Sequence, residues 1–267
     1  MRLLPSEIIC SDLTQSYPIT LLNKLFSSVP TREYAIRDIA LSIGTQHVDL
    51  PTGELEACSN FYILVGRSGC GKSTLLRVLS GGEEPASGNV MLNRNQLYPL
   101  EKRSINQPKP IMLDAKPDCF NDKLTVLQRI EEGTSSDLNA GVRRTIAMEF
   151  ATLLSLSEDE INANPSSLSP SAQYIFGIAC ACVESSAEAV CVRDDGGIEF
   201  PCPILLLDEL IDFETSIVAS RIGKSLQELS RAGAVIVSAT HRPQYFKSFA
   251  DRMITLSSGM ILMNEKL

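Results

Sequence analysis

The chain has 267 residues, of which 44% are hydrophobic and 21% charged, and its net charge is −8. This length and apolar content suffice for one large α/β domain, or for a domain that carries a subdomain. The acidic balance argues against general nucleic-acid binding, which requires a basic surface. No apolar run approaches the roughly twenty residues that a membrane span needs, and the brief apolar start is too short for a secretory signal, so we expect neither.

The eight cysteines predict free thiols rather than a disulfide or zinc framework. Most stand alone in the sequence, and there is no C-x-x-C pair. Cys180 and Cys182 are one residue apart on a predicted helix, so their side chains diverge. We therefore expect a reducing compartment, either the cytosol or the interior of an organelle.

A glycine-rich loop lies between a predicted strand at 61–65 and a predicted helix at 75–79. Its spacing is G-x-x-x-x-G-K-[ST], in the residues Gly66, Arg67, Ser68, Gly69, Cys70, Gly71, Lys72, Ser73 and Thr74. Such a loop turns backbone N–H groups around a polyphosphate, and the helix adds the positive end of its dipole. Lys72 would reach the terminal phosphates and the Ser73 hydroxyl would hold Mg²⁺. The plainer alternative, a glycine turn with a solvated Lys72, is disfavoured by the strand and helix on either side. The loop predicts a nucleoside triphosphate site.

The second informative run is 203–207, a fully apolar stretch that ends in Asp208 and Glu209. Such a run is typical of a strand buried on both faces of a parallel sheet, whose carboxyl end is where α/β sheets bind ligands. Asp208 would join the magnesium shell and Glu209 would polarise an attacking water. The alternative, an acidic pair that caps a helix, is weaker beside a phosphate loop.

A third predicted strand at 234–240 runs into His241, one of only two histidines. A lone histidine is most often a core or surface residue. Its place after a strand downstream of Glu209 instead favours contact with the γ-phosphate or the attacking water. His47 has no such context, and we expect it at the surface.

Two helix-start signals lie between these motifs. Ser157 precedes three acidic residues, and Ser169 precedes Pro170, which suits the first position of a helix. We therefore expect helices that begin just after Ser157 and Ser169.

The order of these motifs resembles the nucleotide-binding ATPase subunits of the ABC (ATP-binding cassette) superfamily over nearly the whole chain. Further segments also resemble parts of that family. Residues 8–17 look like its first strand and 35–43 like the strand before the phosphate loop. Residues 81–90 look like the turn after the first helix, 124–127 like the start of the helical subdomain and 250–259 like the last strand pair.

The resemblance implies an α/β fold of the P-loop NTPase class. It would have a RecA-like core with a mostly parallel sheet, an antiparallel β subdomain and an inserted helical subdomain of ABC type. Residues 1–116 and 183–267 would form the nucleotide-binding core, and 117–182 the helical subdomain with the family's signature motif. The implied ligands are ATP and Mg²⁺.

The resemblance also assigns roles at the edges of the site. Tyr17 would stack on adenine, the alternative being a strand-end tyrosine in the core. The signature, L-S-G-G-Q in the family, stands here as Leu168-Ser169-Pro170-Ser171-Ala172-Gln173. In that family the signature motif of one subunit contacts the γ-phosphate bound by its partner in a head-to-tail dimer. For this contact Ser169 here keeps its hydroxyl and Ser171 its backbone N–H. Pro170 has no N–H, so we expect a weaker contact across the dimer.

Three segments depart from the family pattern. The Q-loop glutamine aligns with Lys116, or less well with Gln107, and the shortened D-loop has Asp212 as its candidate aspartate. Residues 18–33 and 185–201 are longer than the family's connections, and we expect both to be surface insertions.

The resemblance implies the energy-coupling ATPase subunit of an ABC transporter. It would work as a homo- or heterodimer with a second ABC ATPase subunit and a separate membrane permease. It would lie in the cytoplasm or an organelle interior, peripheral to the membrane. Two alternatives stay open: a soluble ABC-type ATPase in cofactor assembly or repair, and a degenerate cassette that binds ATP to dimerise but hydrolyses little.

Overall fold

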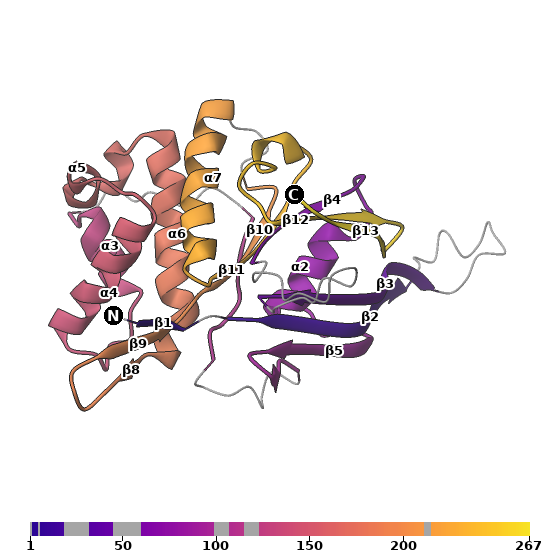
Figure 1. Cartoon of the computed structure of the whole chain (residues 1–267), viewed down its shortest axis with the longest axis horizontal. Coiled ribbons are helices and arrows are strands. Elements are labelled where there is room, and N and C mark those ends of the chain that lie inside the picture. The colour runs from indigo at the N-terminus through magenta and orange to yellow at the C-terminus, as the bar shows by residue number, and fades with distance from the viewer. Residues whose placement is uncertain are drawn as a thin grey trace, which may run out of the picture.

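The computed structural model describes residues 2–4, 6–18, 32–44, 60–98, 107–114, 123–210 and 215–267. Within these ranges the chain forms three β-sheets and a group of helices (Figure 1).

The central sheet has six strands in the order β13-β12-β4-β11-β10-β7. All pairings are parallel except that of β12 with the edge strand β13. In sheet order the strands are Met260–Lys266, Arg252–Ser257, Phe61–Val65, Val235–Ala239, Ile204–Asp208 and Ile111–Leu113. The predicted parallel core is thus confirmed.

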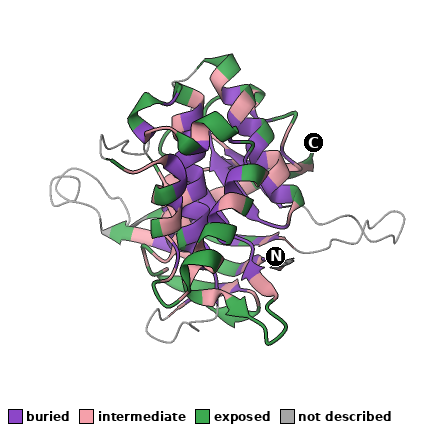
Figure 2. Cartoon of the chain, turned by 90° about the vertical axis from the view of Figure 1, so that its left-hand side faces the viewer, coloured by how far each residue is buried: buried purple, intermediate pink, exposed green. Residues whose placement is uncertain are grey.

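Alternate residues of the central strands enter two separate cores, which explains why the strands read as unbroken apolar runs. Phe61 and Ile63 of β4 pack with the helices, whereas Tyr62 and Leu64 pack toward the second sheet. Figure 2 shows this buried interior between exposed outer surfaces.

The second sheet is the predicted antiparallel β subdomain, with the order β3-β2-β5-β6. Its strands are Arg32–Ile43, Ile8–Pro18, Ser87–Leu92 and Asn95–Gln96. Helix α2, Lys72–Ser80, shares one apolar core with this sheet and with one face of the central sheet. The phosphate loop, which precedes α2, is therefore held between two sheets.

The other face of the central sheet is covered by helices, which Figure 1 shows side by side. The α-helices are α3 (Val126–Glu132), α4 (Ala140–Leu153), α5 (Glu158–Asn162), α6 (Pro170–Ser186) and α7 (Ser216–Arg231). Short 3₁₀ turns lie at Pro165–Ser167, Ala187–Ala189 and Pro243–Tyr245. None of the helices within the described ranges has both the length and the apolar character that crossing a bilayer requires.

Both predicted helix starts are confirmed. Ser157 caps α5 in a reciprocal capping box with Glu160, and the Ser169 hydroxyl caps α6 with Pro170 in its first turn. Since α6 continues to Ser186, the division of the chain at residue 182 falls inside a helix. The boundaries of the helical subdomain stay a prediction.

The expectation of a simple surface insertion at 185–201 is wrong. Strands β8 (Cys191–Val192) and β9 (Ile198–Pro201) form a hairpin, and β9 pairs in parallel with β1 (Arg2–Leu4) in a third sheet. Phe200 is fully buried and packs against Phe150 with ring centroids 5.1 Å apart. Strand β8 and the turn that follows it are exposed, whereas the end of β9 is buried and carries Phe200 into the helical core.

Candidate nucleotide-binding site

The loop between β4 and α2 has a backbone that only glycine can adopt at two positions. Gly66 and Gly71 have φ values of +156° and +107°. A Cβ atom would lie 2.4 Å from the Leu256 carbonyl oxygen at Gly66, and 2.2 Å from that of Ala35 at Gly71. The two glycines let the loop pack against β12 and β3 without a clash.

The N-terminus of α2 opens into a pocket of about 160 Å³. Gly71 is its N-cap and offers no side chain to the first N–H groups of the helix, which have no partner within it. A Cβ on Gly69 would meet no atom within 4 Å, so the loop leaves room there. The pocket is lined by Ala35, Ser68, Gly69, Gly71, Lys72, Ser73, Thr74 and Glu209. Open space, free N–H groups and a helix dipole together suit a polyphosphate.

Lys72 is the buried cation of this pocket, with 4% of its side chain exposed. Its Nζ donates to the Gly66 carbonyl oxygen at 3.1 Å, lies 3.5 Å from His241 Nε2 and 3.9 Å from Glu209 Oε1. The structure thus brings together the three residues predicted to act on the γ-phosphate. A buried ammonium group must be paired with an anion, and the carboxylate of Glu209 is 3.9 Å away, so a phosphate would be a favourable additional partner for Lys72.

Glu209 and His241 meet because β10 and β11 are parallel neighbours whose carboxyl ends align, Asp208 opposite Ala239. His241 Nε2 lies 2.7 Å from Glu209 Oε1. Glu209 adopts a left-handed φ of 55°, and its N–H donates to the Ala239 carbonyl oxygen at 2.9 Å. A non-glycine residue in that region is strained, and such strain concentrates at functional sites.

The predicted magnesium ligands fit the ion they would hold. Asp208 Oδ1 is buried without a hydrogen-bond partner among the described residues. Ser73 lies in the phosphate-loop pocket that Glu209 also lines. Oxygen donors of this type, completed by phosphate oxygens and water, are the set that Mg²⁺ takes in nucleotide sites. No cluster of three His, Cys, Asp or Glu side chains suited to a metal occurs in the described part of the chain. A protein-only metal cage is therefore absent from those residues.

Tyr17 is not a core residue, so the plainer alternative for it is wrong. Its side chain is 37% exposed at the end of β2. Its hydroxyl accepts a hydrogen bond from Arg77 Nη2 at 3.3 Å. Stacking on adenine stays a prediction.

The signature segment is tied to α7 by a contact that the sequence did not indicate. Arg221 Nη1 donates to Ser171 Oγ at 3.1 Å, and its Nη2 lies 2.8 Å from both carboxylate oxygens of Glu160. Ser169 Oγ lies 3.4 Å from Ser171 Oγ. Because Ser171 is in the first turn of α6, its N–H has no partner within the helix. Whether Ser169 and Ser171 touch a partner's nucleotide stays a prediction.

Gln107 is ruled out as the Q-loop residue by its position. It precedes β7, which runs parallel to β10, so it lies beyond the amino ends of these strands and away from the phosphate loop. It is buried there, with 3% exposure. Lys116, Asp212 and His47 lie outside the described residues.

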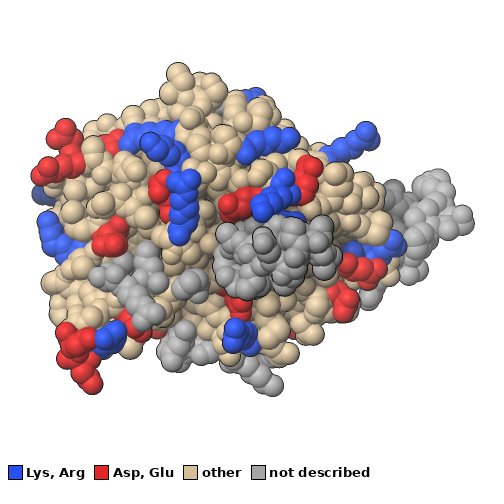
Figure 3. All heavy atoms as spheres, in the orientation of Figure 1, with Lys and Arg blue, Asp and Glu red and all other residues tan. Residues whose placement is uncertain are grey.

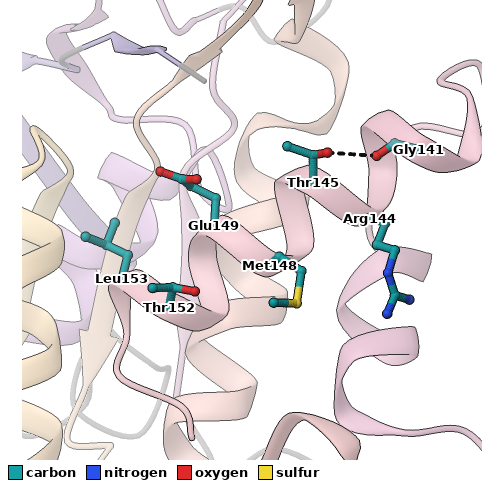
Figure 4. A pocket seen from close by; sticks show the side chains of 7 residues that line it. All are labelled: Gly141, Arg144, Thr145, Met148, Glu149, Thr152 and Leu153. Atoms are coloured by element: carbon teal, nitrogen blue, oxygen red, sulfur yellow. Dashed lines mark hydrogen bonds between the residues drawn. The ribbon is translucent and has the colours of Figure 1, made fainter. Parts of the chain in front are cut away.

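Among the pockets larger than that at the phosphate loop, two lie beside the helices. One, of about 500 Å³, runs along α4 beside Arg144, Met148 and Glu149, as Figure 4 shows. The other, of about 410 Å³, lies between β7, α3 and α6. Over the described part of the face in Figure 3, basic and acidic side chains are interspersed. Cys10, Cys70, Cys180, Cys182, Cys191 and Cys202 are free thiols, as predicted.

An α/β core with a glycine loop between its strand β4 and helix α2 is that of a P-loop NTPase. The sequence model of the family described as "ABC transporter" matches residues 56–191, half of the chain. The chain belongs to the ABC transporter family.

Relatives and solved structures agree. The spermidine/putrescine import ATP-binding protein PotA of Bacillus cereus is 28% identical over 80% of this chain and 58% of its own length. The methionine import ATP-binding protein MetN of Mesorhizobium japonicum is 29% identical over 74% and 51%. The chain thus spans little more than half of these two relatives.

Among solved structures, CbiO1 of Clostridium perfringens, part of an ABC transporter complex, has a TM-score of 0.71 at 18% identity, covering 98% of this chain and 89% of its own. The dimeric cassette MJ0796 in a post-hydrolysis state with ADP and Pi has a TM-score of 0.62 at 23% identity, covering 97% and 98%. These likenesses show the fold.

Proposed function

We propose that the protein binds and hydrolyses ATP as the energy-coupling ATPase subunit of an ABC transporter, working as a head-to-tail dimer. The observation that carries this proposal is the meeting of Lys72, Glu209 and His241 at the N-terminus of α2. These groups supply a charge, a base and a second polar contact at the place where the loop would hold the terminal phosphate.

The phosphate loop would bind the triphosphate through its backbone N–H groups, from Gly66 to Thr74. Ser73 and Asp208 would hold Mg²⁺, which supplies charge neutralisation to the phosphates when bound. Lys72 would place its ammonium against the terminal phosphates. Hydrolysis in this class depends on positioning and electrostatic stabilisation more than on covalent chemistry.

The Glu209 carboxylate would orient and polarise the attacking water and accept its proton. His241, 2.7 Å from that carboxylate, would hold Glu209 in place and contact the γ-phosphate. When the Lys72 ammonium pairs with a phosphate, the Glu209 carboxylate would leave its ion pair with Lys72, now 3.9 Å long, and would face the water. The strained backbone of Glu209 fixes this carboxylate at the strand end.

The partners and the location belong to the same proposal. The second subunit would be another ABC ATPase, identical or different, whose signature completes the site. The named relatives are ATP-binding proteins of importers, which supports a separate membrane permease. The chain would lie in the cytoplasm or an organelle interior, peripheral to the membrane. Residues 1–116 and 183–267 would form the core, and 117–182 the helical subdomain.

Pro170 favours a second candidate, a cassette that binds ATP to dimerise with little turnover. The proline removes one N–H from the signature, while Ser169 and Ser171 remain. In a heterodimer, this chain would supply Lys72, Asp208, Glu209 and His241 to one competent site and a weak signature to the other. A soluble ABC-type ATPase in cofactor assembly or repair would use the same site without a permease.

The test is ATP turnover together with the molar mass of the isolated chain, with and without Mg-ATP, beside Glu209→Gln. Turnover with an ATP-induced dimer supports a self-sufficient ATPase. A monomer that binds ATP and barely hydrolyses it supports the need for a partner's signature. A chain that does not bind ATP at all would overturn the proposal.

A further inference from the structure

One side chain touches both the phosphate loop and the predicted adenine contact. Arg77 lies on α2, one turn after Thr74, and its Nη2 donates to Thr74 Oγ1 at 3.2 Å. The same Nη2 donates to the Tyr17 hydroxyl oxygen at 3.3 Å. Tyr17 is on β2, in the other sheet of the site. Arg77 therefore links two elements that would hold opposite ends of a nucleotide.

The guanidinium is itself held in place from the side. Arg77 Nε donates to Glu83 Oε2 at 3.1 Å, and Gln15 Nε2 donates to Glu83 Oε1. Gln15 in turn accepts from the N–H of Ala86 at 2.8 Å. Gln15 and Tyr17 both lie on β2, two residues apart. Strand β2, the turn after α2 and the Arg77 side chain thus form one connected unit.

Arg77 and Glu83 are both favoured in their charged forms by the contacts around them. Although burial raises it, the pKa of Glu83 lies below its ordinary value because of hydrogen bonds from Tyr17, Gln15 and Arg77. The hydrogen bond to Tyr17 is the largest cause that raises the pKa of Arg77. A hydrogen bond to a charged group is stronger than one between neutral groups, so the Arg77 guanidinium holds the Tyr17 hydroxyl in one position.

The rest of the Tyr17 side chain stays available. With 37% exposure, the ring is tied at its hydroxyl end while part of its surface is open. A ring already held in one orientation loses less conformational entropy when a base stacks on it. The same tie sets how far the ring lies from the phosphate loop, because Arg77 bonds to both.

We infer that Arg77 is a positioning residue that sets the Tyr17 ring at a fixed distance from the phosphate loop, and so adds affinity for a purine nucleotide over bare polyphosphate. The inference rests on the proposed binding of ATP. Arg77 acts through Tyr17 and does not itself touch the nucleotide.

The experiment compares the binding of Mg-ATP and of magnesium tripolyphosphate by calorimetry. The variants are Tyr17→Phe, which keeps the ring and removes the hydroxyl, Arg77→Met, Arg77→Lys and the double variant Tyr17→Phe/Arg77→Met. Arg231→Met is the matched control, because Arg231, like Arg77, lies in the last turn of a helix and pairs with a glutamate, but its helix is α7. Melting temperatures identify any variant that fails to fold.

We expect Arg77→Met to weaken ATP binding roughly two- to tenfold, the range for one lost hydrogen bond, and Tyr17→Phe, which also loses its bond to Glu83, by at least as much. Tripolyphosphate binding should change less than about twofold. The double variant should bind ATP no more weakly than Tyr17→Phe alone, since that substitution already removes the bond between Tyr17 and Arg77. Arg77→Lys should behave like Arg77→Met, because a lysine cannot bridge three partners with a planar fork. Arg231→Met should bind both ligands as the parent does.

Equal weakening of ATP and tripolyphosphate by the Arg77 variants would overturn the inference, since Arg77 would then act on the phosphates through Thr74. Unchanged ATP binding in Tyr17→Phe would overturn it too, and this variant decides the matter even where Arg77→Met does not fold. A parent chain that binds neither ligand would overturn the proposed function, and the inference with it. A parent that binds both, beside variants that are unaffected, would overturn the inference alone.

Discussion

The Nε2 atom of His241 lies 2.7 Å from the Oε1 atom of Glu209, across the aligned carboxyl ends of β11 and β10. Both side chains are part-exposed, at 39% and 36%, whereas the Lys72 side chain that faces them is 4% exposed. The polar pair therefore lies where a ligand can reach it, and the cation lies beneath. This arrangement gives the Glu209 carboxylate and the Lys72 ammonium separate expected phenotypes.

Replacing the Glu209 carboxylate by an amide should stop turnover and spare binding. Glu209→Gln keeps the shape of the side chain and its contact with His241, but cannot accept a proton. General base catalysis contributes roughly 10²–10⁴ in rate, so kcat should fall by at least about a hundredfold. ATP affinity should stay within a few fold, and a dimer held by unhydrolysed ATP should accumulate. A Glu209→Gln variant that turns over ATP at the parent rate would remove Glu209 from the mechanism.

Loss of the buried cation should act on binding instead. Lys72→Ala removes the ammonium that we expect to meet the terminal phosphates. Hydrogen bonds to charged groups are worth about 1.5–3 kcal/mol, so ATP affinity should fall at least roughly tenfold, measured by calorimetry. AMP, which lacks those phosphates, serves as the comparison ligand. Equal loss of ATP and AMP binding would show a general disruption of the loop.

The central strands and the phosphate loop could be predicted from sequence because their signals are local. A β-strand buried on both faces is an unbroken apolar run, as in 61–65 and 203–207. The loop needs glycine at fixed positions, because Gly66 and Gly71 have positive φ and closely packed neighbours. The caps at Ser157 and Ser169 lie within one turn of the residues they bond.

The contacts that the sequence did not indicate join residues far apart in the chain. Arg221 meets Glu160 and Ser171 only because α7 packs beside α5 and the start of α6. Arg77 on α2 meets Tyr17 on β2, sixty residues earlier in the chain. The pairing of β1 with β9 likewise brings the chain's first strand to a segment that resembles a polar loop. No periodicity or spacing carries such long-range information.

Alanine at two loop glycines should separate folding from binding. Gly71→Ala places a Cβ 2.2 Å from the Ala35 carbonyl oxygen, so the backbone must shift and the melting temperature should fall clearly. Gly69→Ala meets no atom within 4 Å and adds only the left-handed strain, roughly 1–2 kcal/mol. Since Gly69 lines the phosphate pocket, Gly69→Ala should stay folded and bind ATP more weakly. A Gly69→Ala variant with parent affinity would show that phosphates do not approach this part of the loop.

The ion pair between Arg221 and Glu160 should make the free energy of unfolding depend on pH in the acid range. Burial opposes it, but the bond from the Ser157 N–H and the contacts of Arg221 hold the pKa of Glu160 below its ordinary value of 4.5. A carboxyl whose pKa is lower in the folded chain stabilises the fold above its unfolded pKa, and this contribution is lost as pH falls through the folded pKa. Urea unfolding of the parent and of Glu160→Gln should therefore differ by about 1 kcal/mol at pH 7, the value of one part-buried charged bond. The difference should shrink as the pH falls below 4.5.

Glu132→Gln is the matched control for this acid dependence, because Glu132 pairs with Arg129 in an exposed contact on α3. An exposed pair of this kind contributes little, so Glu132→Gln should track the parent at every pH. Arg221→Met should reproduce the loss seen in Glu160→Gln and should also remove one hydrogen bond from the Ser171 hydroxyl, since Arg221 donates to both partners. A gap between parent and Glu160→Gln that is unchanged from pH 7 to pH 3 would mean that the glutamate stabilises the fold by packing and not by its charge.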